Sequence, residues 1–124
     1  MKFFKCEHCG NVTVLLVPVG VPMTCCGQRM SELAVNQGDA PGGKHIPAVT
    51  VKGNGVSVMI GEQEHPMLPD HRIEFVYLET AQGGQYKSPK IGRKPEAEFT
   101  LATGDTPIAA YEYCNLHGLW KKDI

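Results

Sequence analysis

The sequence lacks the long uninterrupted segments on which helices are built. It contains 14 glycines and 9 prolines in 124 residues, and the longest stretch free of both spans residues 70–82. That stretch contains Arg-Ile-Glu-Phe-Val-Tyr-Leu-Glu, whose β-branched and aromatic residues favour strands. We therefore expect a mostly β protein.

Long apolar runs and strong charge are also missing. The longest apolar run, residues 12–23, is interrupted by Pro18, Gly20 and Pro22 and is shorter than the roughly 20 residues that cross a bilayer. The first residues, Met-Lys-Phe-Phe-Lys-Cys, do not form a secretory signal. The net charge of −1 lacks the basic excess typical of nucleic-acid-binding domains. We expect a cytoplasmic protein that binds neither membranes nor nucleic acids.

The potential metal ligands divide the chain by type. Four of the five cysteines lie within the first 26 residues, whereas four of the five histidines lie beyond residue 40. Residues 36–43 between them are turn-forming and flexible residues. We expect a small domain at residues 1–36, which needs a metal or another staple at this size, and a second domain at residues 37–124.

The second domain reads as short strands separated by turns. Hairpin turns are expected at Gly53-Asn54-Gly55 and Gln82-Gly83-Gly84. Antiparallel strands at this spacing predict a β-sandwich of immunoglobulin-like architecture. The expected strands span residues 47–51, 56–60, 72–80, 85–87, 96–101 and 108–113.

The first donor set consists of Cys6 and Cys9, in a Cys-x-x-Cys pair, and the adjacent Cys25 and Cys26. In a reducing compartment clustered thiols are more often metal ligands or redox groups than disulfides. Four thiolates suit tetrahedral iron or zinc, and the spacing does not choose between them. A thioredoxin-type redox pair fits less well because no βαβ unit surrounds it. His8 is expected to be solvated.

The second donor set lies in the larger domain. Cys114 and His117 are three residues apart after an expected strand, and the other histidines adjoin strand ends, where the loops of a sandwich converge. Five nitrogen and sulfur donors leave one position of an octahedral ion open, as a reactive metal requires. Because zinc prefers four ligands, this set favours iron, with copper as a competitor. The candidate ligands are His45, His65, His71, His117 and Cys114.

Several short motifs accompany these ligands in a fixed order along nearly the whole chain. They are Lys44-His45-Ile46-Pro47, His65-Pro66-Met67, His71 and Cys114-Asn115-Leu116-His117-Gly118-Leu119-Trp120. With the four cysteines, they resemble the superoxide reductase family of the two-iron, desulfoferrodoxin type. The resemblance implies a desulforedoxin-like domain with tetrahedral iron on four cysteines, where zinc is also possible. It also implies a neelaredoxin-like domain with square-pyramidal iron on four equatorial histidines and an axial cysteine.

The resemblance also implies an activity and partners. Members of the family reduce superoxide to hydrogen peroxide with an electron from an external donor, commonly a rubredoxin, and form homodimers or homotetramers. Lys44 matches the lysine that approaches the open iron position. Gly43 stands where the family usually has a glutamate that binds ferric iron. Glycine has no side chain that could bind the iron. We therefore expect the open position of the oxidised iron to be vacant or to hold water or hydroxide, unless Glu62 or Glu64 reaches it.

Three other functions remain possible from the residues alone. A blue-copper carrier would use Cys114 and His117, but residues 118–124 contain no axial methionine. An interaction module with structural zinc in both sites leaves a five-donor set unexplained. A dismutase would need a similar iron centre. Six cations form either an ordinary solvated face or, if they surround the site, a field that attracts superoxide; they are Lys87, Lys90, Arg93, Lys94, Lys121 and Lys122.

Overall fold

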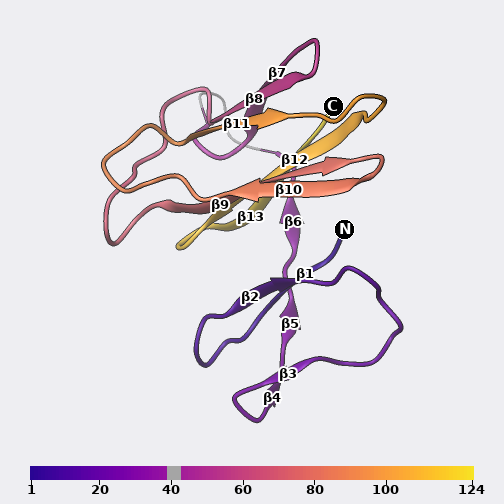
Figure 1. The fold of residues 1–124 in the computed structure, drawn as a ribbon. Coiled ribbons are helices and arrows are strands. Elements are labelled where there is room, and N and C mark those ends of the chain that lie inside the picture. Colours follow the sequence, from indigo (N-terminus) through magenta and orange to yellow (C-terminus); the bar gives the residue numbers. More distant parts are fainter. Residues whose placement is uncertain (39–42) are drawn as a thin grey trace. The chain divides into compact units, whose positions relative to one another are not determined.

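The structure, a computed structural model, describes residues 1–38 and 43–124. Every regular element within these ranges is a strand (Figure 1), which confirms the mostly β class. No helix in this part of the chain is long and apolar enough to cross a membrane. The chain forms two compact units, Met1–Ala34 and Val35–Ile124.

The larger unit consists of two sheets. One has the strand order β10-β9-β12-β13-β6 and the other the order β11-β8-β7, and all neighbours are antiparallel except β13 and β6. This arrangement confirms the expected sandwich. The strands are β6 (Val35–Asn36), β7 (Pro47–Lys52), β8 (Gly55–Ile60), β9 (Ile73–Thr80), β10 (Gly83–Lys87), β11 (Glu96–Thr100), β12 (Pro107–Cys114) and β13 (Gly118–Asp123).

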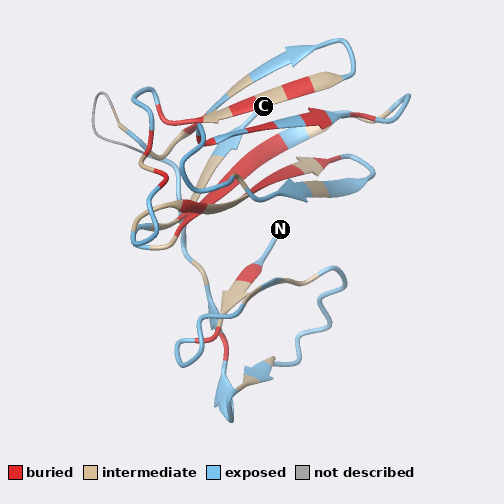
Figure 2. Ribbon diagram, turned by 60° about the vertical axis from the view of Figure 1, so that its left-hand side comes forward, coloured by how far each residue is buried: buried red, intermediate tan, exposed pale blue. Residues whose placement is uncertain are grey.

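Alternating side chains of these strands form the core. Along β8, Val56, Val58 and Ile60 are buried, while their neighbours are more exposed, as the period of two in a strand requires. Figure 2 shows the same banding of buried and exposed segments along the strands. The core also includes Leu78 and Phe99, so both sheets contribute to it.

Two hairpins and one strand differ in detail from the sequence expectation. Lys52 pairs with Gly55, so the first turn consists of Gly53 and Asn54, and Gly55 of the expected turn already belongs to β8. Thr80 pairs with Gly83, so the second turn lies one residue earlier, at residues 81–82. Gly84 lies within β10, where an added Cβ would stand 2.0 Å from the Tyr77 hydroxyl oxygen. The strand β13 is an addition to the expected strands. Its second half is Lys-Lys-Asp, and it pairs with β12 along its whole length.

The smaller unit buries little. Its strands form a three-stranded sheet, β2-β1-β5, and a separate hairpin, β3-β4. Among its hydrophobic residues, only Phe3, Cys6 and Met30 are buried. A unit with so small a core needs an additional staple. Its strands are β1 (Phe3–Lys5), β2 (Val12–Val14), β3 (Thr24–Cys25), β4 (Gln28–Arg29) and β5 (Ser31–Glu32).

Candidate metal centres

The first pair of cysteines is held by a tight turn after β1. The N–H of Cys6 donates to Asn11 O and the N–H of Gly10 donates to Cys6 O, both at 2.9 Å. The N–H of Cys9 then points at Cys6 Sγ, 3.5 Å away. Gly10 has a φ of 86°, which a residue with a side chain rarely adopts. The turn therefore presents both sulfurs on one side.

The adjacent cysteines, Cys25 and Cys26, lie at the end of β3 and in the β3–β4 turn. Cys25 pairs with Gln28, so Cys26 and Gly27 form a two-residue turn, with φ of 53° and 70°. Two consecutive positive φ angles are typical of a type I′ turn, where Asn-Gly is preferred. Cys26 is the one non-glycine residue with positive φ in the described ranges. A cysteine in this unfavourable place indicates that its sulfur is needed there.

The four sulfurs form one cluster. They lie within 4.8 Å of one another, with Cys9 and Cys25 Sγ 3.6 Å apart, and none of the cysteines is in a disulfide. The N–H of Cys9 lowers the pKa of Cys6 to about 6, whereas contact with the Cys9 thiol raises the pKa of Cys26 to about 12. Four thiolates this close repel one another unless a cation neutralises them. The cluster fits a tetrahedral metal ion.

The histidines of the larger unit form a closed ring of four imidazoles. Neighbouring ring centroids are 4.7 to 5.1 Å apart, and neighbouring planes are inclined by 61° to 78°. One histidine precedes β7, two lie in the β8–β9 connection and one lies in the β12–β13 turn. The fold thus brings together side chains from three segments. In order around the ring they are His45, His65, His71 and His117.

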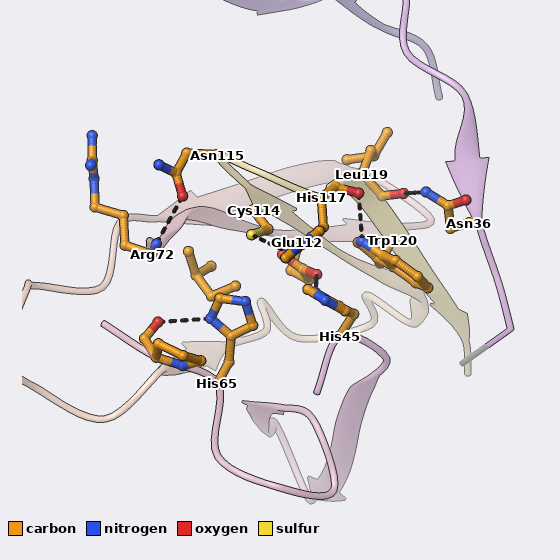
Figure 3. Close-up of polar contacts among 12 residues, drawn as sticks. Asn36, His45, His65, Arg72, Glu112, Cys114, Asn115, His117, Leu119 and Trp120 are labelled. Atoms are coloured by element: carbon orange, nitrogen blue, oxygen red, sulfur yellow. Dashed lines mark hydrogen bonds and ion pairs between the residues drawn. The ribbon is translucent and has the colours of Figure 1, made fainter. Parts of the chain in front are cut away.

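Cys114 adds a sulfur to this ring. It is fully buried at the end of β12, and its Sγ lies 3.7 Å from His117 Nδ1 (Figure 3). The possible ligand atoms of Cys114, His45, His65 and His117 all lie within 4.8 Å of one another. His71 is outside this tight group but contacts the rings of His65 and His117.

The ring nitrogens fit a metal ion. His65 Nδ1 lies 2.7 Å from Pro66 O, so Nδ1 carries the hydrogen and Nε2 keeps its lone pair. Burial lowers the pKa of His65 to about 4, which keeps the ring neutral. The Nε2 atoms of His65 and His71 are buried, and no described residue offers either one a hydrogen bond. Buried polar atoms without a partner are costly, and coordination by a metal satisfies them.

Two residues that the sequence did not single out as ligands support the ring. Glu112 is fully buried, and its Oε1 lies 3.5 Å from His45 Nδ1, as in the carboxylate–histidine–metal arrangements that orient ligands. Trp120 stacks on His45 with centroids 4.5 Å apart and planes at 11°, and its Nε1–H donates to His117 O. Glu112 could have been found as an acid inside an otherwise apolar strand, two residues before Cys114.

The segment before β7 is held close to the β8–β9 connection. The N–H of Glu62 donates to Gly43 O at 3.1 Å. Gly61 has a φ of 84°, and a Cβ there would lie 2.6 Å from Lys44 O, so only glycine fits. The side chain of Lys44 is exposed beside His45, and Glu62 and Glu64 are exposed as well.

The six cations noted in the sequence have different surroundings. The Nζ of Lys87 donates to Glu98 O and lies over the Phe99 ring, and the Nζ of Lys121 pairs with Asp123 at 2.9 Å. These two are engaged within the sandwich. Three others, Lys90, Arg93 and Lys94, line a hollow of about 520 Å³ together with Pro89 and Glu96.

Comparisons with known proteins agree with this site. A family model described as Desulfoferrodoxin matches residues 37–123. The chain is 40% identical to a desulfoferrodoxin of Syntrophotalea carbinolica over 99% of this chain and 96% of the relative. It is 30% identical to a superoxide reductase of Pyrococcus horikoshii over 77% of this chain and 97% of the relative. The crystal structure of the superoxide reductase from Treponema pallidum superimposes with a TM-score of 0.86 and 35% identity, covering 98% and 97% of the two chains.

Proposed function

The chain belongs to the desulfoferrodoxin family, and we propose that it is a superoxide reductase of the two-iron type, with a desulforedoxin-like domain at residues 1–36 and a catalytic sandwich at residues 37–124. The observation that carries this function is the closed ring of four imidazoles beside a buried thiol. The two donor sets fit the two iron centres of the family.

The reaction consumes one superoxide, one electron and two protons, and yields one hydrogen peroxide. Iron held by this donor set would supply a one-electron couple and a place for the anion to bind. His45, His65, His71 and His117 would hold this iron through ring nitrogens, and Cys114 would hold it through its sulfur. Burial raises the pKa of Cys114, while the N–H groups of Leu116 and His117 donate to its sulfur and act in the opposite direction. With a metal ion in the site, its charge would act in the same direction as these N–H groups and favour the ionised sulfur.

The test of this function is the stoichiometry of a single turnover. The iron-loaded protein is reduced, freed of excess reductant and mixed with superoxide without a donor. One hydrogen peroxide should form for each superoxide consumed at the larger unit's centre, and no dioxygen. A dismutase would release dioxygen and form half as much peroxide per superoxide, and that result would overturn the proposal.

Lys44 is the residue expected to attract superoxide to the open position. It is exposed and directly precedes His45, and a nearby cation raises the encounter rate of a small anion. Lys44→Ala should lower the second-order rate constant with superoxide by about tenfold at low salt, and less at high salt. Lys52→Ala, which removes an exposed lysine of β7, is the control. Equal rate constants for the two variants at all salt concentrations would contradict this role.

The electron donor is expected to be a small acidic protein of the rubredoxin kind. The hollow lined by Lys90, Arg93 and Lys94 offers it a basic surface, and the N–H of Gly92 ties the same loop to Met67 O, two residues after His65. Lys90→Glu/Lys94→Glu should raise the KM for a reduced rubredoxin severalfold and leave reduction by ascorbate unchanged. An unchanged KM for rubredoxin would refute this docking surface.

A homodimer is expected to cover the apolar loop of the smaller unit. Residues 12–23 contain no charged side chain, and four of their apolar side chains, Leu16, Val17, Val19 and Val21, are 70% to 80% exposed. Such patches mark interaction sites. Val17→Asp/Val19→Asp should halve the mass measured by light scattering, whereas Val51→Asp on the sandwich should not. A monomeric parent, or a double variant that keeps the parent's mass, would contradict this assembly.

A further inference from the structure

The β9–β12 ladder ends in an irregular way beside the histidine ring. Tyr113 pairs with Phe75, but the next pair is Cys114 with Ile73, so Glu74 is bulged out of the ladder. Bulges beside active sites redirect the chain that follows. One step further, the N–H of Asn115 still donates to Arg72 O at 3.1 Å, although neither residue belongs to a strand.

The side chain of Asn115 continues this ladder. Its Oδ1 accepts a hydrogen bond from the N–H of Arg72 at 2.8 Å, and its Nδ2 donates to Asp70 O at 3.0 Å. Figure 3 shows the Asn115 amide beside Arg72 at the end of the sheet. The amide thus acts as an extra peptide group, with one donor and one acceptor. Its two bonds bracket His71 from both sides in the sequence.

Other polar contacts of this segment stay within the β8–β9 connection and the start of β9. Leu68 and His71 exchange backbone bonds of 2.9 and 3.2 Å. The guanidinium of Arg72 donates to Pro69 O and to Glu74. These bonds shape the segment, whereas the bonds of Asn115 tie it to the turn that carries Cys114 and His117.

We propose that Asn115 is a positioning residue that holds His71 in the metal centre of the larger unit. His71 is the histidine outside the tight group of ligand atoms, and its Nε2 is buried and receives no hydrogen bond from the described residues. Its place therefore depends on the backbone of residues 70–72, which the Asn115 amide ties to the β12–β13 turn. The inference rests on the proposed function, because it takes His71 as an iron ligand.

The experiment is a double-mutant cycle on the affinity for ferrous iron, measured without oxygen against a competing chelator. The variants are Asn115→Ala, His71→Ala and the double variant. Because partners of metal ligands are worth about 10- to 100-fold in affinity, Asn115→Ala should weaken iron binding in the larger unit by that factor. Asn115→Asp keeps the acceptor for Arg72 N–H and loses the donor to Asp70 O. Its affinity for ferrous iron should lie between those of the parent and Asn115→Ala.

A control and the non-additivity of the cycle make the result specific. Gln85→Ala removes a side-chain amide that donates to Thr100 O at 2.9 Å on a distant part of the sandwich, and it should leave iron affinity unchanged. In the His71→Ala background, Asn115→Ala should have no further effect. Additive losses would show that Asn115 acts through another ligand and would overturn the proposal. If His71→Ala leaves the affinity unchanged, the ligand assignment itself fails, and the proposal fails with it.

Discussion

Replacing Cys114 with serine is expected to leave iron on the four histidines and to lower the rate constant for superoxide reduction by more than about 100-fold. Partners of metal ligands are already worth 10- to 100-fold, and this change removes a ligand. A serine hydroxyl stays protonated at neutral pH and offers no soft anionic sulfur. Cys114 is fully buried beside the ring, and it is the one cysteine in the sequence of residues 35–124, so no other thiol of the larger unit can take its place.

The measurement is a fast-mixing reaction of the reduced, iron-loaded variant with superoxide, with iron content determined on the same sample. Asn36→Ala, which removes the hydrogen bond from Asn36 Nδ2 to Leu119 O, is a control for disturbance of the strands beside the site, and it should react at the parent rate. A Cys114→Ser protein that keeps its iron and the parent rate would show that the thiolate is not needed for the reaction.

The clustering of the proposed ligands could be predicted from the sequence because part of it is local. Cys-x-x-Cys and Cys-x-x-His spacings place two ligands on one turn, and the structure shows such turns at Cys9 and His117. The order of the four histidines around the ring could not be predicted. It depends on the β8–β9 connection, whose path is set by the bulge at Glu74 and by the close approach of Gly61 to Lys44.

The residues that support the proposed ligands could not be predicted from the sequence for a related reason. Glu112 reads as one polar residue in a strand, and only the sandwich shows that it is fully buried against His45. In the sequence, Asn115 is only one residue of a motif, because its partners Asp70 and Arg72 are 45 and 43 residues away. Long-range contacts therefore orient the proposed ligands, whereas the local spacing in the sequence indicates which residues are candidates.

The smaller unit should depend on its metal for folding. It buries only Phe3, Cys6 and Met30 among its hydrophobic residues, and a small structural metal site contributes on the order of 10 kcal/mol to folding. In Cys9→Ser/Cys26→Ser, the amide hydrogens of residues 1–34 should therefore exchange with solvent as in an unfolded chain. The amides of the sandwich, with its own core, should keep their protection. Hydrogen exchange followed by mass spectrometry makes the comparison.

The same variant separates folding of the small unit from catalysis. Because the ligands proposed for the reactive centre all lie beyond residue 44, the pre-reduced variant should react with superoxide at the parent rate constant in a single turnover. His8→Ser, which changes the residue between Cys6 and Cys9 without removing a sulfur, should keep both the protection and the rate. A parent-like exchange pattern in the double cysteine variant would show that metal is not the staple of this unit. A large loss of the single-turnover rate would instead assign the four-cysteine site a direct part in the reaction.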